Sequence, residues 1–213
     1  MRSPSVFRAI DSRAAPRDSA KVLNAREACV NVGAKMKRAM RCNWDQTRAV
    51  MSITCDVGGE APDFDLAAGP ERRITLKEFR GKKLVLYFYP RDDTSGCTAE
   101  AIDFNALKGE FAKAGAAVVG VSPDSVKSHD RFRAKHDLAL DLAADPDKAV
   151  VSAYGVWVEK SMYGRKYMGV ERSTFLIDRE GLIASVWRKV KVAGHAQEVL
   201  AAVRAAGAAE RAK

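Results

Sequence analysis

Cys97 is the residue of this chain best placed to do chemistry. It lies in the segment YFYPRDDTSGCTAE, residues 87–100, where an apolar run meets a proline, a polar turn and the start of a predicted helix. The nucleophile is a thiolate rather than a thiol, and free N–H groups at a helix N-terminus favour a negative charge. Thr94 is near enough in a tight turn for its hydroxyl to face the sulfur. The pattern indicates a reactive thiol, with an inert core cysteine as the alternative.

The elements that must position Cys97 alternate between strand and helix patterns. Residues 83–89 form an apolar, β-rich run typical of a buried central strand. Apolar residues at 97, 101, 104 and 111 predict a helix with one buried face. Further strands are predicted at 61–66, 73–76, 116–121, 138–143, 173–178 and 182–187, and further helices at 125–136, 147–154 and 195–206. This order predicts an α/β sandwich with a mixed sheet, and places Cys97 after a strand's carboxyl end, the usual position of a site in such folds.

The charge of the chain is unevenly distributed. Of a formal net charge of +9, residues 1–50 contribute +7, from 11 Lys and Arg against 4 Asp and Glu. Residues 51–213 are nearly balanced, with 25 basic and 23 acidic residues, so we expect no nucleic-acid surface there. No apolar run approaches the ~18 residues of a membrane span, and we expect no membrane partner.

The first 50 residues are interpreted as a basic N-terminal extension, disordered or not native, ahead of a domain at 51–213. They are rich in Arg, Ala and Ser and poor in acids, which are traits of transit peptides. A tail or an over-long reading of the start is the preferred interpretation, and a targeting segment is the alternative. Met51 opens what looks like a complete domain.

The cysteines and histidines do not have the spacing of a metal site. The four cysteines, Cys29, Cys42, Cys55 and Cys97, form no C-x-x-C pair, and the three histidines are scattered. We therefore expect neither a metal nor an organic cofactor. This cysteine pattern suits a reducing, cytoplasmic compartment rather than a secreted disulfide framework.

The motif Pro90-x-x-x-Thr94-x-x-Cys97 resembles the active-site signature of peroxiredoxins, and its longer context is similar to the Q-type, or bacterioferritin-comigratory, branch. Similar segments occur at 58–64, 119–125, 154–157 and 162–178, so the resemblance covers roughly 56–205. It implies a thioredoxin-like three-layer sandwich, with a central mixed sheet flanked by helices. It also implies a peroxidase that reduces hydrogen peroxide and organic hydroperoxides in antioxidant defence.

The resemblance also implies a role for each matching residue. Cys97 would attack the peroxide O–O bond and become a sulfenic acid. Thr94 would hydrogen-bond the thiolate and the peroxide, and Arg172 would hold its guanidinium near the sulfur and polarise the peroxide. Pro90 would shape the loop and shield the sulfur. Glu100 also matches, and is interpreted as a helix-surface residue that pairs with an arginine.

The chain departs from this family in its second cysteine. Many Q-type members have a resolving cysteine five residues after the first, but position 102 is isoleucine and no cysteine follows Cys97. We expect a one-cysteine mechanism with an external reductant, namely thioredoxin, glutaredoxin or glutathione, in a monomer or weak homodimer. Cys97 of a second subunit, Cys55, Cys42 and Cys29 remain alternative resolving thiols.

Two other functions use the same thiol. A disulfide oxidoreductase requires a C-x-x-C motif, whereas the third residue after Cys97 is Glu100. A redox sensor or chaperone that signals through oxidation of Cys97 is the alternative from another class. Turnover separates it from a peroxidase, because a sensor needs only stoichiometric oxidation.

Overall fold

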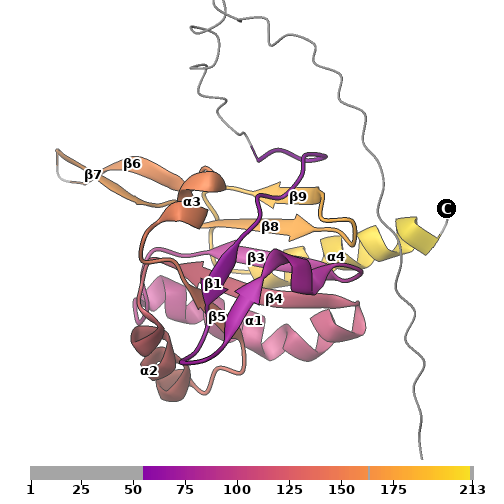
Figure 1. Ribbon diagram of the computed structural model, residues 1–213, viewed down its shortest axis with the longest axis horizontal. Coiled ribbons are helices and arrows are strands. Elements are labelled where there is room, and N and C mark those ends of the chain that lie inside the picture. The colour runs from indigo at the N-terminus through magenta and orange to yellow at the C-terminus, as the bar shows by residue number, and fades with distance from the viewer. Residues whose placement is uncertain (1–54, 163, 212–213) are drawn as a thin grey trace, which may run out of the picture. The chain divides into compact units, whose positions relative to one another are not determined.

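A seven-stranded mixed sheet forms the centre of the fold (Figure 1). The computed structural model describes residues 55–162 and 164–211, so the predicted extension at 1–50 lies outside the described residues. The sheet order is β2-β1-β5-β4-β3-β8-β9, in which β3, β4 and β5 are parallel and β8 is antiparallel to β3. A separate two-stranded sheet, β6-β7, extends to the left in Figure 1.

Apart from η1 and the strands β6 and β7, the described elements follow the alternation that the sequence predicts. The strands are β1 (Asp65–Ala67), β2 (Arg73–Thr75), β3 (Lys83–Phe88), β4 (Ala116–Ser122), β5 (Asp141–Ala144), β6 (Trp157–Met162), β7 (Arg165–Val170), β8 (Ser173–Ile177) and β9 (Ile183–Trp187). The helices are η1 (Leu76–Phe79), α1 (Ser95–Lys113), α2 (Val126–His136), α3 (Ala149–Ala153) and α4 (His195–Arg211). The mixed sheet flanked by helices confirms the predicted architecture.

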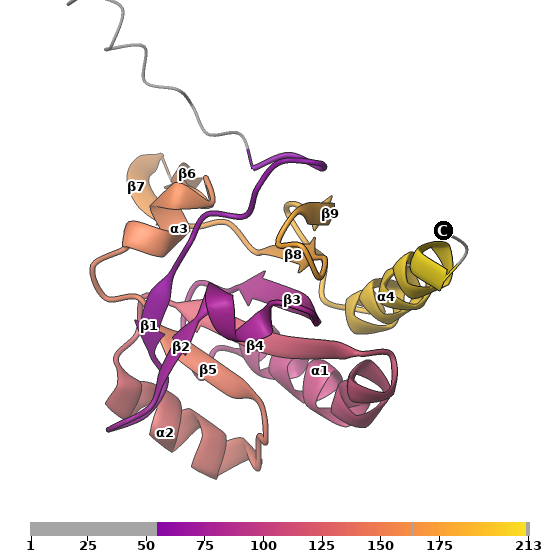
Figure 2. The ribbon, with the colours of Figure 1, turned by 45° about the vertical axis from the view of Figure 1, so that its right-hand side comes forward.

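Strand β3 is buried along its whole length because the sheet is covered on both faces. Leu84, Leu86 and Phe88 point into one hydrophobic cluster, which also receives residues of α3. Val85 and Tyr87 point into a second cluster, with the buried faces of α1, α2 and α4. Figure 2 shows these three helices together on one side of the sheet. Period-2 alternation therefore divides the core into two layers.

The predicted strand at 138–143 begins later than expected. Residue Asp137 ends α2 in the left-handed conformation, with φ of 51°. The next two backbone N–H groups then bond outside the sheet, Leu138 to the Arg133 carbonyl and Ala139 to the side chain of Asn105. Strand β5 consequently starts at Asp141.

The hairpin of β6 and β7 was not predicted. Its strands pair only with each other, from Trp157 opposite Val170 to Met162 opposite Arg165. Because most of its residues are exposed, it lacks the apolar alternation by which a half-buried strand is recognised.

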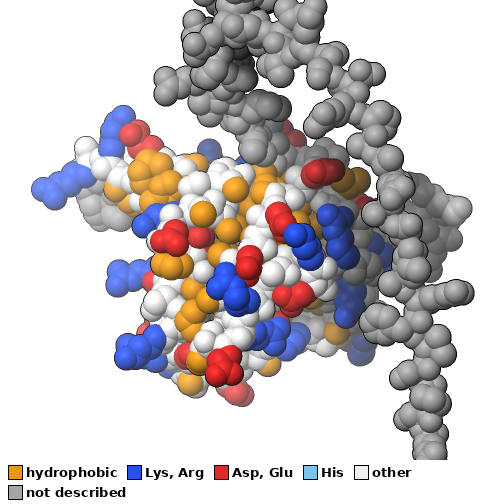
Figure 3. Space-filling view, viewed as in Figure 1, with side chains coloured by type: hydrophobic (Ala, Val, Ile, Leu, Met, Phe, Trp, Pro, Cys, Tyr) orange, Lys and Arg blue, Asp and Glu red, His pale blue; other side chains and the backbone are white. Residues whose placement is uncertain are grey.

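The described surface carries both signs of charge. Basic and acidic side chains are interspersed over the face shown in Figure 3. In residues 55–162 and 164–211 no helix is both long enough and apolar enough to cross a membrane.

Candidate active site

Cys97 lies in the first turn of α1, just beyond the carboxyl end of β3. Its side chain is buried among the apolar residues on the α1 side of the sheet, and the residue is 2% exposed. The Thr98 N–H donates to the Thr94 carbonyl at 2.8 Å, which closes the first helical turn. The N–H groups of residues 95–97 therefore have no acceptor within the helix, and they point out of its N-terminal end, where Cys97 lies.

Arg172 brings a positive charge to this sulfur. It lies in the short link between β7 and β8, and its backbone carbonyl accepts a hydrogen bond from the Val190 N–H at 3.0 Å. Its Nη2 atom donates to Cys97 Sγ at 3.2 Å. The guanidinium also lies close to the backbone at Gly96, where a Cβ would be 3.4 Å from Nη2, an ordinary contact distance.

Glu100 holds the other side of the same guanidinium. Its Oε2 atom accepts a hydrogen bond from Arg172 Nη1, whereas Oε1 is buried without a partner among the described residues. Burial raises the pKa of Glu100 to about 7, against the opposing effect of Arg172. For Arg172, burial opposes the charge, but Glu100 and Cys97 outweigh it and raise the pKa of the guanidinium. The expected surface position of Glu100 was wrong, because Glu100 lies on the same buried face of α1 as Cys97 and Ala101. The expected pairing with an arginine is present.

Thr94 and Pro90 lie on the loop between β3 and α1. Thr94 is exposed, and its hydroxyl donates to the carbonyl of Arg91 at 3.2 Å rather than to Cys97. Pro90 follows the end of β3 and is exposed. Of the four residues expected in the site, the structure brings Cys97 and Arg172 into direct contact. The other two lie on the segment 89–94 between β3 and α1, which we call the approach loop.

A buried histidine ties the strand after Arg172 to α4. The ring Nε2 of His195 is 2.8 Å from the hydroxyl of Thr174, and the ring packs edge-on against Trp187. Burial lowers the pKa of His195, and the nearby charge of Arg172 acts in the same direction. This contact fixes Thr174, the second residue of β8, two residues beyond Arg172.

The second described cysteine, Cys55, lies in the other half of the core. It is also 2% exposed, but its neighbours are the apolar residues on the α3 side of the sheet. Its Sγ donates to the carbonyl of Ala153 at 3.3 Å. Burial raises the pKa of the Cys55 thiol, only partly opposed by Arg188. Cys29 and Cys42 lie outside the described residues.

The described part of the chain holds no cluster of His, Cys, Asp and Glu that could bind a metal ion. His136 and His129 each contact an aspartate of the approach loop, and His195 contacts Thr174. The three rings are therefore engaged separately.

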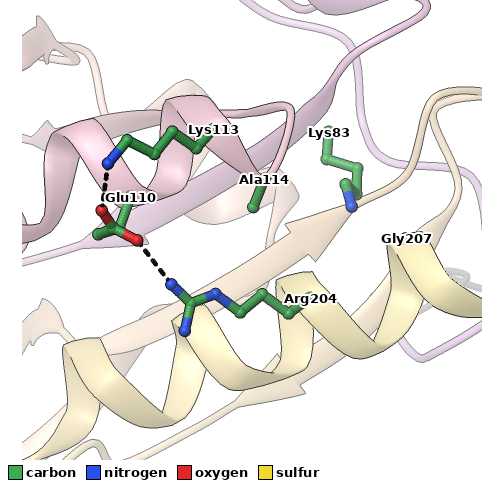
Figure 4. Close-up of a pocket in the computed structure, with 6 residues that line it drawn as sticks. All are labelled: Lys83, Glu110, Lys113, Ala114, Arg204 and Gly207. Atoms are coloured by element: carbon green, nitrogen blue, oxygen red, sulfur yellow. Dashed lines mark hydrogen bonds and ion pairs between the residues drawn. The ribbon is translucent and has the colours of Figure 1, made fainter.

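A polar cavity lies at the far end of α1 from Cys97. Glu110 spans it, with one oxygen 2.8 Å from Lys113 and the other 2.7 Å from Arg204 of α4 (Figure 4). The buried Lys83 ammonium lies nearby and donates to the Val203 carbonyl at 2.8 Å. Glu110 lies 13 positions after Cys97 along α1, about 20 Å away at the usual rise. The cavity therefore belongs to the packing of α1 on α4 and not to the thiol site.

Sequence reasoning missed two residues, Asp92 within the approach loop and His129 of α2 beneath it. Both are buried, and the His129 Nδ1 atom lies 2.9 Å from Asp92 Oδ2. The available signal was the position of His129 on the same face of α2 as Phe132, three residues on, which predicts burial of a polar ring.

Comparisons with known proteins agree on one family. The family model described as the AhpC/TSA family matches residues 57–186. A peroxiredoxin Bcp of Xanthomonas campestris is 54% identical over 143 residues, 67% of this chain and 89% of that protein. A peroxiredoxin Bcp of Bacillus subtilis is 45% identical over 148 residues, 70% of this chain and 94% of that protein.

The solved structures that resemble this fold include the bacterioferritin comigratory protein of Xanthomonas campestris, which was studied for its alkyl peroxide reduction activity. It superposes with a TM-score of 0.67 and 51% sequence identity, and the match covers 71% of this chain and 99% of that one.

Proposed function

The chain belongs to the AhpC/TSA family and is a peroxiredoxin with a thioredoxin-like fold, and from this premise we propose that Cys97 is the residue that reduces the peroxide. The observation that supports this most directly is the 3.2 Å contact between Arg172 Nη2 and Cys97 Sγ in the first turn of α1. A cation and a helix N-terminus both favour the thiolate, which is the nucleophilic form.

The proposed reaction transfers one oxygen atom to sulfur. The Cys97 thiolate attacks the terminal oxygen of ROOH, an S–O bond forms, and the O–O bond breaks. The alkoxide that leaves takes up one proton, so that the products are a sulfenic acid and ROH. Negative charge moves from sulfur to the leaving oxygen during this step, and Arg172 with the free N–H groups of α1 is placed to stabilise it.

We assign supporting roles to Thr94 and Pro90. The Thr94 hydroxyl bonds the Arg91 carbonyl in the structure, and rotation about its χ1 angle would turn it to the peroxide. Pro90, with its fixed φ, shapes the turn that leads from β3 to the helix. Glu100 orients the guanidinium through its bond to Nη1.

An external thiol completes the cycle in this proposal. One thiol condenses with the sulfenic acid to a mixed disulfide and releases water, and a second thiolate displaces Cys97. Thioredoxin, glutaredoxin and glutathione all supply such thiols. The absence of any cysteine after Cys97 supports this route.

The substrates we propose are hydrogen peroxide and alkyl hydroperoxides, in line with the alkyl peroxide reduction studied in the Xanthomonas protein. Both described cysteines are free thiols, which supports a reducing, cytoplasmic location. We propose a monomer or weak homodimer as the working form.

The test is steady-state peroxide consumption by the full chain, coupled to thioredoxin and its reductase and then to glutaredoxin and glutathione. We expect many turnovers per protein with at least one reductant, and a loss of about 10³-fold or more in Cys97→Ser. A single stoichiometric burst with every reductant would contradict the peroxidase and favour a redox sensor.

A further inference from the structure

A buried aspartate anchors the loop that leads to Cys97. Asp92 lies between the end of β3 and the start of α1 and is 8% exposed. Its Oδ1 accepts a hydrogen bond from the Tyr89 hydroxyl at 2.8 Å, and its backbone N–H donates to Asp124 Oδ2 at 2.7 Å. Its Oδ2 is 2.9 Å from Nδ1 of His129. Burial acts to raise the pKa of Asp92, but its side-chain hydrogen bonds to His129, Ser128 and Tyr89 outweigh it and lower the pKa, so that Asp92 is held as a carboxylate.

Beside Tyr89, His129 supplies a second buried side-chain hydrogen bond to Asp92. Its side chain is 1% exposed, in the second turn of α2. Its Nε2 atom is buried without a partner among the described residues. A proton on Nε2 would be an unpaired donor in an apolar site, which favours the tautomer that carries its proton on Nδ1 and donates it to Asp92. His129 therefore holds the loop through one oriented hydrogen bond.

Asp93, the residue after Asp92, shows which part of the loop the bond between Asp92 and His129 restrains. Asp93 has a φ of 56°, a left-handed conformation that is uncommon for residues other than glycine, although Asp adopts it more readily than most. Outside the core it is held by Lys135 at 2.5 Å and by His136 at 2.9 Å, both at the end of α2. Thr94 comes next, and α1 begins one residue later. Such exposed contacts contribute little stability, so the buried bond from His129 is the stronger restraint on the loop.

We propose that His129 is a positioning residue for peroxide reduction, acting through Asp92 to fix the loop that presents Thr94 and Cys97. This inference rests on the proposed function of Cys97. It requires a donor at the position of Nδ1, not an imidazole ring as such. The role is thus distinct from filling the core, and chemically conservative variants can separate the two.

Three variants at position 129 keep, displace or remove the hydrogen-bond donor. Asparagine carries its amide nitrogen where the ring has Nδ1, so His129→Asn should keep the bond to Asp92. Glutamine carries it one bond further, at the position of Nε2, and His129→Gln should lose the bond. His129→Leu removes the donor and keeps apolar volume. His136→Leu, on the same helix but against Asp93, is the matched control.

The measurement is the rate of Cys97 oxidation by peroxide divided by its rate of alkylation by iodoacetamide, on folded full-length protein. Alkylation needs only an accessible thiolate, whereas peroxide must also be aligned by Thr94 and Arg172. Misplacement of a catalytic group by about 1 Å can cost about 10²-fold. We therefore expect the ratio to fall about tenfold or more in His129→Leu and His129→Gln, and to stay within about threefold in His129→Asn and His136→Leu.

An unchanged ratio in His129→Leu overturns the inference, as does an equal fall in His129→Asn and His129→Gln. If His129→Leu does not fold, the comparison of Asn with Gln decides. A wild-type protein that peroxide does not oxidise at Cys97 contradicts the proposed function instead, so the two failures are distinguishable.

Discussion

The two faces of the central sheet each bury one cysteine to the same extent, yet only one of these thiols accepts a hydrogen bond from a cation. Cys97 and Cys55 are both 2% exposed, in separate hydrophobic clusters. Both have an arginine in their neighbourhood. Arg172 donates directly to Cys97 Sγ, whereas Arg188 donates to the carbonyl of Gly155 and lies over the ring of Phe175.

The contrast lies in the groups that surround each buried thiol, since the exposed fraction is the same for both. Desolvation alone disfavours the charged form, and this is the dominant effect at Cys55. Cys97 is buried too, but its sulfur lies in the first turn of α1 and accepts a hydrogen bond from Arg172. The direction of an arginine's donors therefore distinguishes the two sites more than its proximity does.

The largest effect is expected from removing the positive charge of Arg172, which donates to Cys97 Sγ. We expect Arg172→Met to slow oxidation of Cys97 by peroxide about 10²- to 10³-fold, the usual effect of losing one donor to a developing oxyanion. Arg172→Lys should recover part of the loss, because it keeps the charge without the two-pronged geometry. Stopped-flow measurement of sulfenic acid formation gives both rates.

The control for this experiment concerns Glu100, which Arg172→Met would leave buried without its cation. The double variant Arg172→Met with Glu100→Gln removes both charges, and should fold more stably than the single variant while remaining equally slow. Near wild-type rates in either variant would remove Arg172 from the mechanism.

The second prediction, of intermediate size, is that Glu100 makes the free energy of unfolding depend on pH. Its folded-state pKa of about 7 exceeds the ordinary value of 4.5, so the folded protein binds the proton more tightly than the unfolded chain does. The stability from this proton is complete below about pH 4.5 and is lost as pH rises through about 7. By linkage, the loss amounts to about 3 kcal/mol.

Denaturant unfolding of the wild type and Glu100→Gln near pH 5 and near pH 8 measures this loss. The wild type should lose stability relative to the variant between the two conditions. His195, whose pKa is lowered by burial, contributes the opposite slope, but it is present in both proteins and cancels in the difference. A difference independent of pH would show that Glu100 is ionised throughout.

Much of the fold was predictable because its strands are buried or paired in regular alternation. The run at 83–89 is apolar throughout and became the central strand, and the hairpin of β8 and β9 was expected from the turn at 179–181. The start of β5 was not, because Asn105 of α1 takes up the backbone N–H of Ala139. That contact joins residues 34 positions apart and leaves no mark in the local sequence.

The site was predictable only where a motif carried it. The signature around Cys97 and its match at Arg172 together named two groups that lie 75 positions apart and are in contact in the structure. The burial of Glu100 and the bond between Asp92 and His129 depend on how α1 and α2 pack beneath the loop. A charged residue on a helix has the same local pattern whether it faces solvent or an arginine, so sequence alone did not separate these cases.

The smallest expected effect comes from Cys55, and it tests whether the two faces are independent. The sheet lies between the two buried sulfurs, and a disulfide needs Cα atoms about 4.4–6.8 Å apart, so Cys55 cannot resolve the Cys97 sulfenic acid while the sheet is intact. We expect Cys55→Ala to cost about 1 kcal/mol of stability and to leave thioredoxin-coupled turnover within about twofold of the wild type. Peptide mapping after one equivalent of peroxide, without reductant, should yield no Cys55–Cys97 disulfide. Recovery of that disulfide peptide would mean that the sheet opens during the cycle and that the two faces act together.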